Sequence, residues 1–170
     1  MYSKLLVPLD GSATAELALG HAVALARMSG GTVALLHVIE ELKHSNGFER
    51  PRVYLEQVRP GFLAAGQALL DAAAAQVRGQ GVAVETRLVE SKGARVSELI
   101  AQQTLAMHCD LVVLGTHGRR GVDRLLLGSA AEQVARIAAV PVMLVRSQPG
   151  TSLPEKPQPM ALGRSGPLGK

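Results

Sequence analysis

Aromatic residues are the scarcest class in this 170-residue chain, which contains no Trp, two Tyr and two Phe. Proteins that bind single-stranded nucleic acid, and the sheet-type RNA-binding modules, stack bases on exposed aromatic rings. Four aromatic side chains in the whole chain argue against that mode of binding. We therefore expect a ligand that is not held by stacking.

The sequence also lacks any run of five or more like charges, although its net charge is +4, from 18 Lys and Arg against 14 Asp and Glu. Residues 147–170 hold three basic residues and one acidic residue, so half of the excess belongs to this C-terminal segment. Nucleic-acid-binding proteins instead concentrate basic residues on one face or arm. We expect no nucleic-acid partner.

Two further absences bear on the compartment. Cys109 is the only cysteine, so no internal disulfide can form, which suits a reducing cytoplasm. Its apolar neighbours predict a buried, unreactive thiol. No apolar run approaches the roughly 18 residues of a membrane span, and the first residues do not resemble a signal peptide. These features predict a cytoplasmic protein without a membrane partner.

Short apolar runs alternate with stretches of helical periodicity. The expected strands are residues 5–9, 32–39, 82–89, 111–114 and 141–145, and the expected helices are residues 14–28, 62–77, 96–107 and 129–137. Such alternation, with continuously apolar strands, predicts an α/β fold in which helices cover both faces of a parallel sheet. We expect one domain over residues 1–146. Residues 40–60 read as a mostly irregular excursion, and residues 147–170, rich in Pro and Gly, as a flexible tail.

The residues that follow two of the strands indicate where a ligand binds. Open α/β sheets bind ligands beyond the carboxyl ends of their strands, where the strand order reverses. Pro8-Leu9-Asp10-Gly11-Ser12 comes at the end of the first strand, and a glycine-rich segment, 115–121, follows the fourth. One ligand can contact both only if these strands are neighbours. The prediction is therefore a single open five-stranded sheet of order 3-2-1-4-5, a Rossmann-like half, in place of 2-1-3-4-5.

The second segment carries a G-x2-G-x9-G-S spacing, formed by Gly115, Gly118 and Gly128-Ser129. Glycines let the backbone approach phosphate oxygens and adopt positive φ angles. The start of the helix at residue 129 favours an anion, and the Ser129 hydroxyl suits either an N-cap or a phosphate contact. The spacing is neither a Walker loop nor G-x-G-x-x-G, which disfavours a P-loop NTPase and a dehydrogenase. Two ordinary turns and a capped helix remain the alternative.

Four segments together resemble the universal stress protein family, in its ATP-binding branch. The resemblance covers about residues 3–146 and rests on residues 7–12, His37-Val38, residues 110–118 and residues 125–130. It implies an α/β domain that binds adenine nucleotides, is usually a homodimer and acts in stress adaptation. The last strand, Val142–Val145, would pair across that dimer.

The resemblance also assigns roles in a nucleotide site. Asp10 would contact the ribose, Pro8 and Val38 would lie against the adenine and ribose, and Leu114 would be nearby. The backbone around the spaced glycines would hold the phosphates. The full candidate set is Pro8, Leu9, Asp10, Val38, Leu114, Gly115, Gly118, Arg119, Gly128, Ser129 and Ala130.

Several of these residues have simpler interpretations. Asp10 suits a helix cap or an Asp-Gly turn as well as a ribose contact. Arg119 suits a phosphate partner through charge-assisted hydrogen bonds, or a solvated loop charge. No two histidines have metal-ligand spacing, so we expect no metal held by protein side chains, and Mg²⁺ would arrive with the phosphates.

The resulting hypothesis is a regulatory binding module whose ligand is ATP, ADP or AMP and whose nucleotide state sets its interactions with a protein partner. The alternative is a weak ATPase or phosphotransferase that uses the same site. Only phosphate binding has clear support in the residue pattern, because phosphoryl transfer also needs a positioned nucleophile and a held metal. We therefore assign no catalytic residue.

Overall fold

Five strands and the helices between them form the described part of the chain. The computed structural model describes residues 2–40, 56, 58–116 and 128–146. The elements are, in chain order, β1 (Lys4–Pro8), α1 (Ala13–Ser29), β2 (Thr32–Ile39), α3 (Arg59–Gly79), β3 (Ala83–Glu90), α4 (Val96–Ala106), β4 (Leu111–Gly115), α5 (Ser129–Ile137) and β5 (Val142–Val145).

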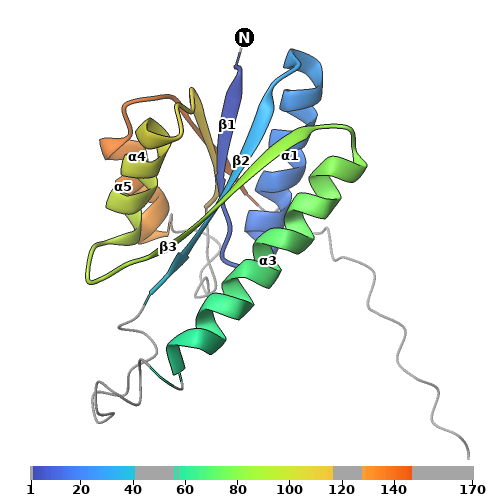
Figure 1. Cartoon of the computed structure of the whole chain (residues 1–170). Coiled ribbons are helices and arrows are strands. Elements are labelled where there is room, and N and C mark those ends of the chain that lie inside the picture. Colours follow the sequence, from blue (N-terminus) through green and yellow to red (C-terminus); the bar gives the residue numbers. More distant parts are fainter. Residues whose placement is uncertain (1, 41–55, 57, 117–127, 147–170) are drawn as a thin grey trace, which may run out of the picture.

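All strand pairs are parallel, and the sheet has the order β3-β2-β1-β4-β5. The predicted order 3-2-1-4-5 is therefore confirmed. In Figure 1, α1 and α3 lie on one side of the sheet and α4 and α5 on the other. The strand order reverses between β1 and β4, so the carboxyl ends of these two strands meet at the lower edge of the sheet in that view.

Each face of the sheet has its own hydrophobic core, because successive side chains of a strand point to opposite faces. In β1, Leu5 and Val7 belong to the core under α1 and α3, whereas Leu6 belongs to the core under α4 and α5. In the same way, Leu35 of β2 packs on the α1–α3 side and Leu36 on the α4–α5 side. All five side chains are fully buried, which explains why β1 and most of β2 are continuous apolar runs.

The ends of the elements differ by a few residues from the prediction. The first strand is Lys4–Pro8 instead of residues 5–9, so Leu9 lies just beyond it. Helix α3 begins at Arg59, three residues before its predicted start, and Pro60 lies in its first turn. Proline is compatible with that position, where its missing N–H has no partner to lose. Residues 41–55, 57 and the tail 147–170 lie outside the described residues.

Cys109 is buried in the α4–α5 core, as predicted. Burial raises the pKa of its thiol to about 11. Among the described residues, no helix combines the length and the apolar character that a membrane crossing needs.

Candidate functional site

Three of the predicted ligand-binding side chains lie on one face of the sheet at its carboxyl edge. Leu6 belongs to the α4–α5 core, so alternation places Pro8 on the same face. Leu6 pairs with Val112, and alternation along β4 places Leu114 on the same face, where it belongs to the α4–α5 core. Val38 packs against the same core from β2. Leu114 is buried, whereas Pro8 and Val38 are half-buried. We call Pro8, Val38 and Leu114 the apolar strip.

Asp10 lies in the turn that joins β1 to α1. Its Oδ1 accepts a hydrogen bond from the backbone N–H of Ser12 at 2.9 Å, and Gly11 between them has a φ of +79°. Ser12 is the N-cap of α1, because its Oγ accepts from the backbone N–H of Ala15 at 3.3 Å. Asp10 therefore completes an Asp-Gly turn, and the alternative in which it caps the helix is wrong.

Gly115 brings the end of β4 into contact with the first turn of α1. A Cβ at this position would stand 2.8 Å from the carbonyl carbon, Cβ and Oγ1 of Thr14. Its φ is not in the left-handed region, and Gly128 has a φ of −60° and a ψ of 141°. Neither of these two glycines therefore adopts the positive φ that glycine permits. The close approach of β4 to α1 is the reason that position 115 requires a glycine.

A backbone hydrogen bond joins the end of β4 to the start of α5. The N–H of Gly128 donates to the carbonyl of Thr116 at 2.8 Å, and the N–H of Thr116 donates to the carbonyl of Val145 at 2.9 Å. Thr116 is 1% exposed. Residues twelve apart in the sequence are thereby held in contact, which places the start of α5 beside β4 and β5. Thr116 is not among the predicted ligand-binding residues, because a lone Thr after a strand has no distinguishing pattern.

The start of α5 presents backbone donors. Gly128 is its N-cap and Ser129 its first residue, so the interpretation of Ser129 as N-cap is wrong. The first bond within the helix runs from the Glu132 N–H to the Gly128 carbonyl at 3.0 Å. The N–H groups before Glu132 have no acceptor inside the helix, and the side chains of Ser129 and Ala130 are exposed. This end of α5 is suited to an anion.

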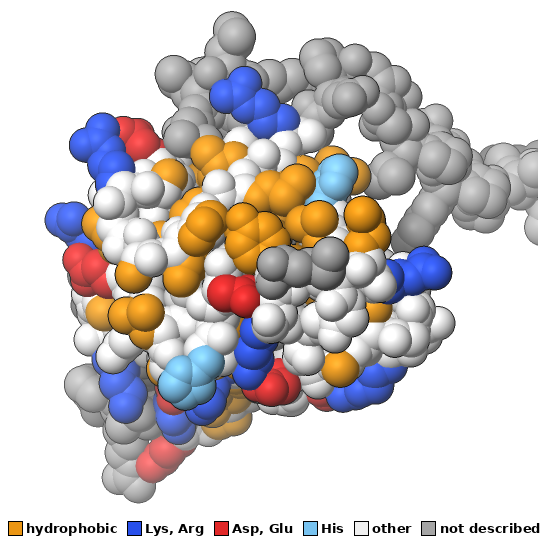
Figure 2. Space-filling model, turned by 90° about the horizontal axis from the view of Figure 1, so that it is seen from above, with side chains coloured by type: hydrophobic (Ala, Val, Ile, Leu, Met, Phe, Trp, Pro, Cys, Tyr) orange, Lys and Arg blue, Asp and Glu red, His pale blue; other side chains and the backbone are white. Residues whose placement is uncertain are grey.

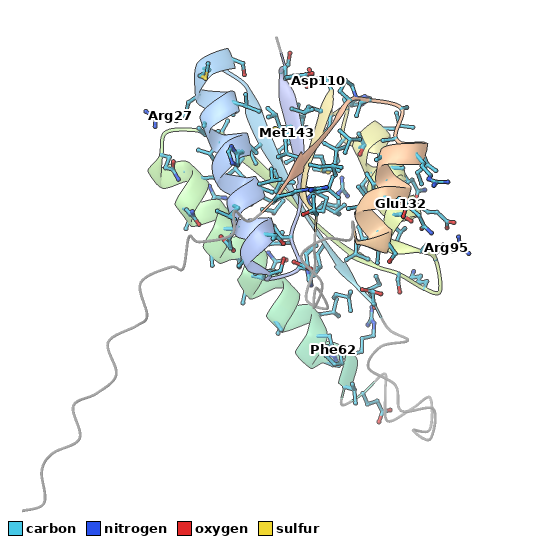
Figure 3. The ribbon with its side chains drawn as sticks, turned by 180° about the vertical axis from the view of Figure 1, so that it is seen from behind. Arg27, Phe62, Arg95, Asp110, Glu132 and Met143 are labelled. Atoms are coloured by element: carbon cyan, nitrogen blue, oxygen red, sulfur yellow. The ribbon has the colours of Figure 1, made fainter. Side chains whose placement is uncertain are left out.

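The acidic side chain in the first turn of α5 is directed away from that end. The Oε1 of Glu132 is 2.8 Å from the Nη2 of Arg136, one turn farther along the helix. Figure 3 shows Glu132 on the side of the molecule formed by α4 and α5. Within the part of the chain that the structure describes, no three His, Cys, Asp or Glu side chains are grouped so as to hold a metal ion.

Leu9 is separated from the apolar strip. Its side chain is 3% exposed and packs in the α1–α3 core, on the opposite face of the sheet. Its N–H donates to the carbonyl of Leu36 at 2.8 Å, and its carbonyl lies 2.7 Å from the Nδ1 of His37. The structure thus does not bring the Leu9 side chain to the other candidates. Gly118 and Arg119 lie outside the described residues.

The profile of the universal stress protein family matches residues 1–146. The chain belongs to this family. Universal stress protein MJ0531 of Methanocaldococcus jannaschii is 29% identical over 151 residues, which span 86% of this chain and 83% of that protein. Universal stress protein YxiE of Bacillus subtilis is 27% identical over 151 residues, spanning 86% of this chain and all of its own length.

Solved structures of similar proteins have the same fold. The hypothetical protein MJ0577 superimposes with a TM-score of 0.76 and 26% identity, over 88% of this chain and 99% of that one. A family protein from Burkholderia pseudomallei gives 0.69 and 30%, over 86% and 97%. Two more distant structures, with TM-scores of 0.62 and 0.59 and identities of 23% and 22%, are a universal stress protein in complex with cAMP and one from Archaeoglobus fulgidus in complex with dAMP.

The opposite edge of the sheet has a different character. A shallow cavity of about 360 Å³ lies there between the α1–β2 and α3–β3 turns, lined by residues that include Arg27, Gly30 and Gly81. Figure 2 looks onto the end at which the strands begin. Hydrophobic side chains gather on part of this face, and basic and acidic side chains are interspersed around them. This view shows no broad basic surface, which agrees with the modest charge of the chain.

Proposed function

We propose that this universal stress protein is a regulatory module that binds an adenine nucleotide, with ATP, ADP or AMP as the ligand. One observation carries the proposal. The apolar strip and the Asp10 turn lie at the carboxyl edge where the strand order reverses, and the Gly128–Thr116 hydrogen bond holds the start of α5 at the end of β4. The cAMP and dAMP complexes of two proteins with this fold support the same ligand class.

The chemistry of each part suits one part of a nucleotide. Adenine would lie against Pro8, Val38 and Leu114, which supply aliphatic surface in place of aromatic rings. Ribose hydroxyls are hydrogen-bond donors, and the Asp10 carboxylate would accept from them. Leu9 would contribute through the backbone that carries Asp10, since its side chain faces the other core.

The phosphates would lie at the start of α5, against the backbone of Gly115, Gly128, Ser129 and Ala130. One helix terminus contributes only about 0.3–1 kcal/mol to anion binding, whereas a micromolar ligand needs roughly 8 kcal/mol. Several contacts must therefore act together, and we include Gly118 and Arg119 among them. Mg²⁺ would arrive with the phosphates, because the described residues offer no cluster of acidic or histidine ligands.

We also propose that the protein is a cytoplasmic homodimer that pairs through β5. This strand is at the edge of the described sheet, and such an edge presents backbone groups to another chain. In Figure 3, β5 with the labelled Met143 lies on the near side of the molecule, between α1 and α5. A nucleotide at the start of α5 would act close to this strand, since Thr116 is bonded to both Gly128 and Val145. The nucleotide state could thus alter the surface offered to a protein partner.

Calorimetric and thermal titrations with ATP and Mg²⁺ test the nucleotide site. At 100 times its Kd, a bound ligand raises the free energy of unfolding by roughly 2.7 kcal/mol. The wild-type melting temperature should therefore rise with millimolar ATP. Native mass spectrometry of the purified protein should show any retained nucleotide together with the dimer mass. No shift and no heat at millimolar ATP would overturn the proposal.

Two variants locate the site. Gly128→Val places a branched side chain where the phosphates would lie, and its φ of −60° and ψ of 141° are accessible to valine, so the backbone can keep its shape. It should abolish the ATP-dependent shift. Asp10→Asn keeps an oxygen for the Ser12 N–H but removes the charge, and should weaken ATP binding about tenfold with little change in the melting temperature of the free protein. Unchanged ATP affinity in both variants would place the ligand elsewhere.

A further inference from the structure

His37 contacts the backbone immediately before Asp10. Its Nδ1 lies 2.7 Å from the carbonyl oxygen of Leu9, although the two residues are 28 apart in the sequence. A carbonyl oxygen only accepts hydrogen bonds, so the Nδ1 of His37 must carry the hydrogen. This hydrogen bond fixes the orientation of the imidazole ring. Val38, the next residue, points to the opposite face of β2 and joins the apolar strip.

The other side of the ring faces Gly66 of α3, and Leu88 of β3 approaches the same glycine. A Cβ on Gly66 would stand 2.8 Å from the Cδ2 and 3.4 Å from the Nε2 of His37, and 2.9 Å from a Cδ1 of Leu88. Only a residue without a side chain leaves this much room on α3. The imidazole is therefore confined between the end of β1 and the face of α3, and has little freedom to swing away from Leu9.

The orientation of one peptide group follows from this contact. The carbonyl of Leu9 and the N–H of Asp10 belong to the same planar peptide unit, so a donor that fixes the carbonyl also fixes the direction in which the chain enters Asp10. On the other side, the Asp10 carboxylate is tied to the Ser12 N–H at 2.9 Å. Asp10 is thus held from both directions, by His37 before it and by its own turn after it.

We propose that His37 is a positioning residue for nucleotide recognition, because it orients the Leu9–Asp10 peptide and so directs the Asp10 carboxylate to the ribose hydroxyls. This inference rests on the proposed function, and assigns the ribose discrimination of that site to a residue that does not touch the nucleotide. A hydrogen bond between a carboxylate and a ligand hydroxyl depends steeply on its geometry. A small rotation of this peptide would weaken ribose binding and leave the phosphate contacts intact.

The test compares ATP with 2′,3′-dideoxy-ATP, which lacks both ribose hydroxyls. The measured quantity is the ratio of their dissociation constants, determined by calorimetry. We expect the wild type to bind ATP about tenfold more tightly than the dideoxy compound. His37→Leu should reduce this ratio to near 1 by weakening ATP alone. His37→Asn, whose Nδ2 can donate from nearly the position of Nδ1, should restore most of the ratio.

A matched control separates positioning from general stability. Leu88→Ala loosens the packing around the same ring without removing a hydrogen bond, so it should lower the melting temperature and leave the ratio unchanged. A ¹⁵N spectrum of the free protein should show the Nδ1–H tautomer of His37. The Nε2–H tautomer, an equal loss of both ligands in His37→Leu, or failure of His37→Asn to restore the ratio would overturn the inference.

The affinities of the wild type for the two ligands also distinguish the role of His37 from nucleotide binding itself. Binding of ATP and dideoxy-ATP with equal affinity would overturn the role of His37 and leave nucleotide binding in place. Binding of neither ligand would overturn both.

Discussion

Gly115 and Thr14 are packed against each other without room for a single additional carbon atom. A Cβ on Gly115 would lie 2.8 Å from three atoms of Thr14, one of which is its backbone carbonyl carbon. Thr14 is itself 8% exposed and lies in the first turn of α1. This contact sets the distance between the end of β4 and the start of α1, and therefore between Thr116 and the Asp10 turn.

The first prediction concerns Gly115→Ala. Because a backbone atom of Thr14 cannot move out of the way as a side chain can, the new methyl group should separate β4 from α1. Overpacking of this kind costs about 1–3 kcal/mol of unfolding free energy. Urea denaturation followed by circular dichroism measures the loss.

Gly20→Ala is its matched control. Gly20 is an exposed residue inside α1, and no atom lies within 4 Å of the place where its Cβ would be. Alanine should stabilise this helix by about 0.5–1 kcal/mol. If Gly115→Ala were as stable as the wild type, the contact with Thr14 would not determine the glycine.

Most of the fold could be predicted from the sequence. The central strands β1 and β4 are unbroken apolar runs because helices cover both faces, whereas the edge strand β3 includes Glu85 and Arg87. One ligand can contact the two segments of unusual composition only if β1 and β4 are neighbours, as they are. The predicted end of β1 and the predicted start of α3 differ from the observed ones for different reasons. Leu9 is as apolar as the strand before it, because its side chain joins the α1–α3 core beyond the last β1 residue. Proline is typical of loops, so Pro60 falls in the predicted excursion, but proline also suits the first turn of a helix.

The sequence predicts which residues form the candidate site, but it does not predict the contacts that these residues make in the fold. The spacing of the glycines is visible in the sequence. The reason for a glycine at position 115 is its close contact with Thr14, and no local sequence pattern connects these two residues. The contact between His37 and Leu9 cannot be predicted from the sequence either, because it depends on the β1–β2 register and on Gly66 of α3. Contacts between residues distant in the sequence decide such details.

Asp110 holds the start of β1 at the opposite edge of the sheet, where Figure 3 labels it. Its two oxygens accept the backbone N–H groups of Ser3 at 2.7 Å and Lys4 at 3.1 Å. Burial alone would raise the pKa of this carboxyl, but hydrogen bonds from the backbone of Ser3, Lys4 and Asp110 and from the Ser3 side chain together outweigh burial and hold the pKa below its ordinary value. Asp110→Asn turns one acceptor into a donor and should lose about 1 kcal/mol of stability at pH 7.

The pH dependence of this loss has a definite sign. A carboxyl whose pKa is lower in the folded than in the unfolded protein stabilises the fold above its unfolded pKa, and this contribution disappears as the pH falls through the folded value. The difference between the wild type and Asp110→Asn should therefore be constant near neutral pH and shrink below about pH 4. A difference that stayed constant down to pH 3 would contradict this account. Asp71→Asn, at an exposed position of α3, should change stability at pH 7 by less than about 0.5 kcal/mol.

Arg59 and Glu90 join the start of α3 to the end of β3 by two parallel hydrogen bonds. The Nε and Nη2 of Arg59 lie 2.6 and 2.7 Å from the two carboxylate oxygens. This guanidinium holds the pKa of Glu90 below its ordinary value, and burial opposes the effect. Lysine cannot form the paired contact, so Arg59→Lys should lower the free energy of unfolding by about 1 kcal/mol.

The exposed pair Arg136–Glu132 provides the comparison. Its side chains are 74% and 49% exposed, against 39% and 16% for Arg59 and Glu90. Arg136→Lys should change stability by less than about 0.5 kcal/mol, because exposed ion pairs contribute little. Equal effects of the two substitutions in urea denaturation would show that the paired geometry at Arg59 has no energetic consequence.

Leu144 tests the proposed dimer. It lies in the middle of β5, the edge strand, with 37% of its surface exposed. A charge there would be buried unpaired if two β5 strands met, and isolated buried charges are costly. Leu144→Lys should therefore convert a dimer of 17.8-kDa chains into a monomer in light scattering or sedimentation.

Leu105→Lys is the control for that substitution. Leu105 is a more exposed leucine, at 58%, and it lies near the end of α4, outside the proposed interface. The same change of apolar for basic side chain should leave the dimer intact at this position. A wild-type chain that sediments as a monomer, or a Leu144→Lys variant that remains a dimer, would exclude pairing through β5. Dissociation by both variants would mean that added charge, rather than the position on β5, separates the chains.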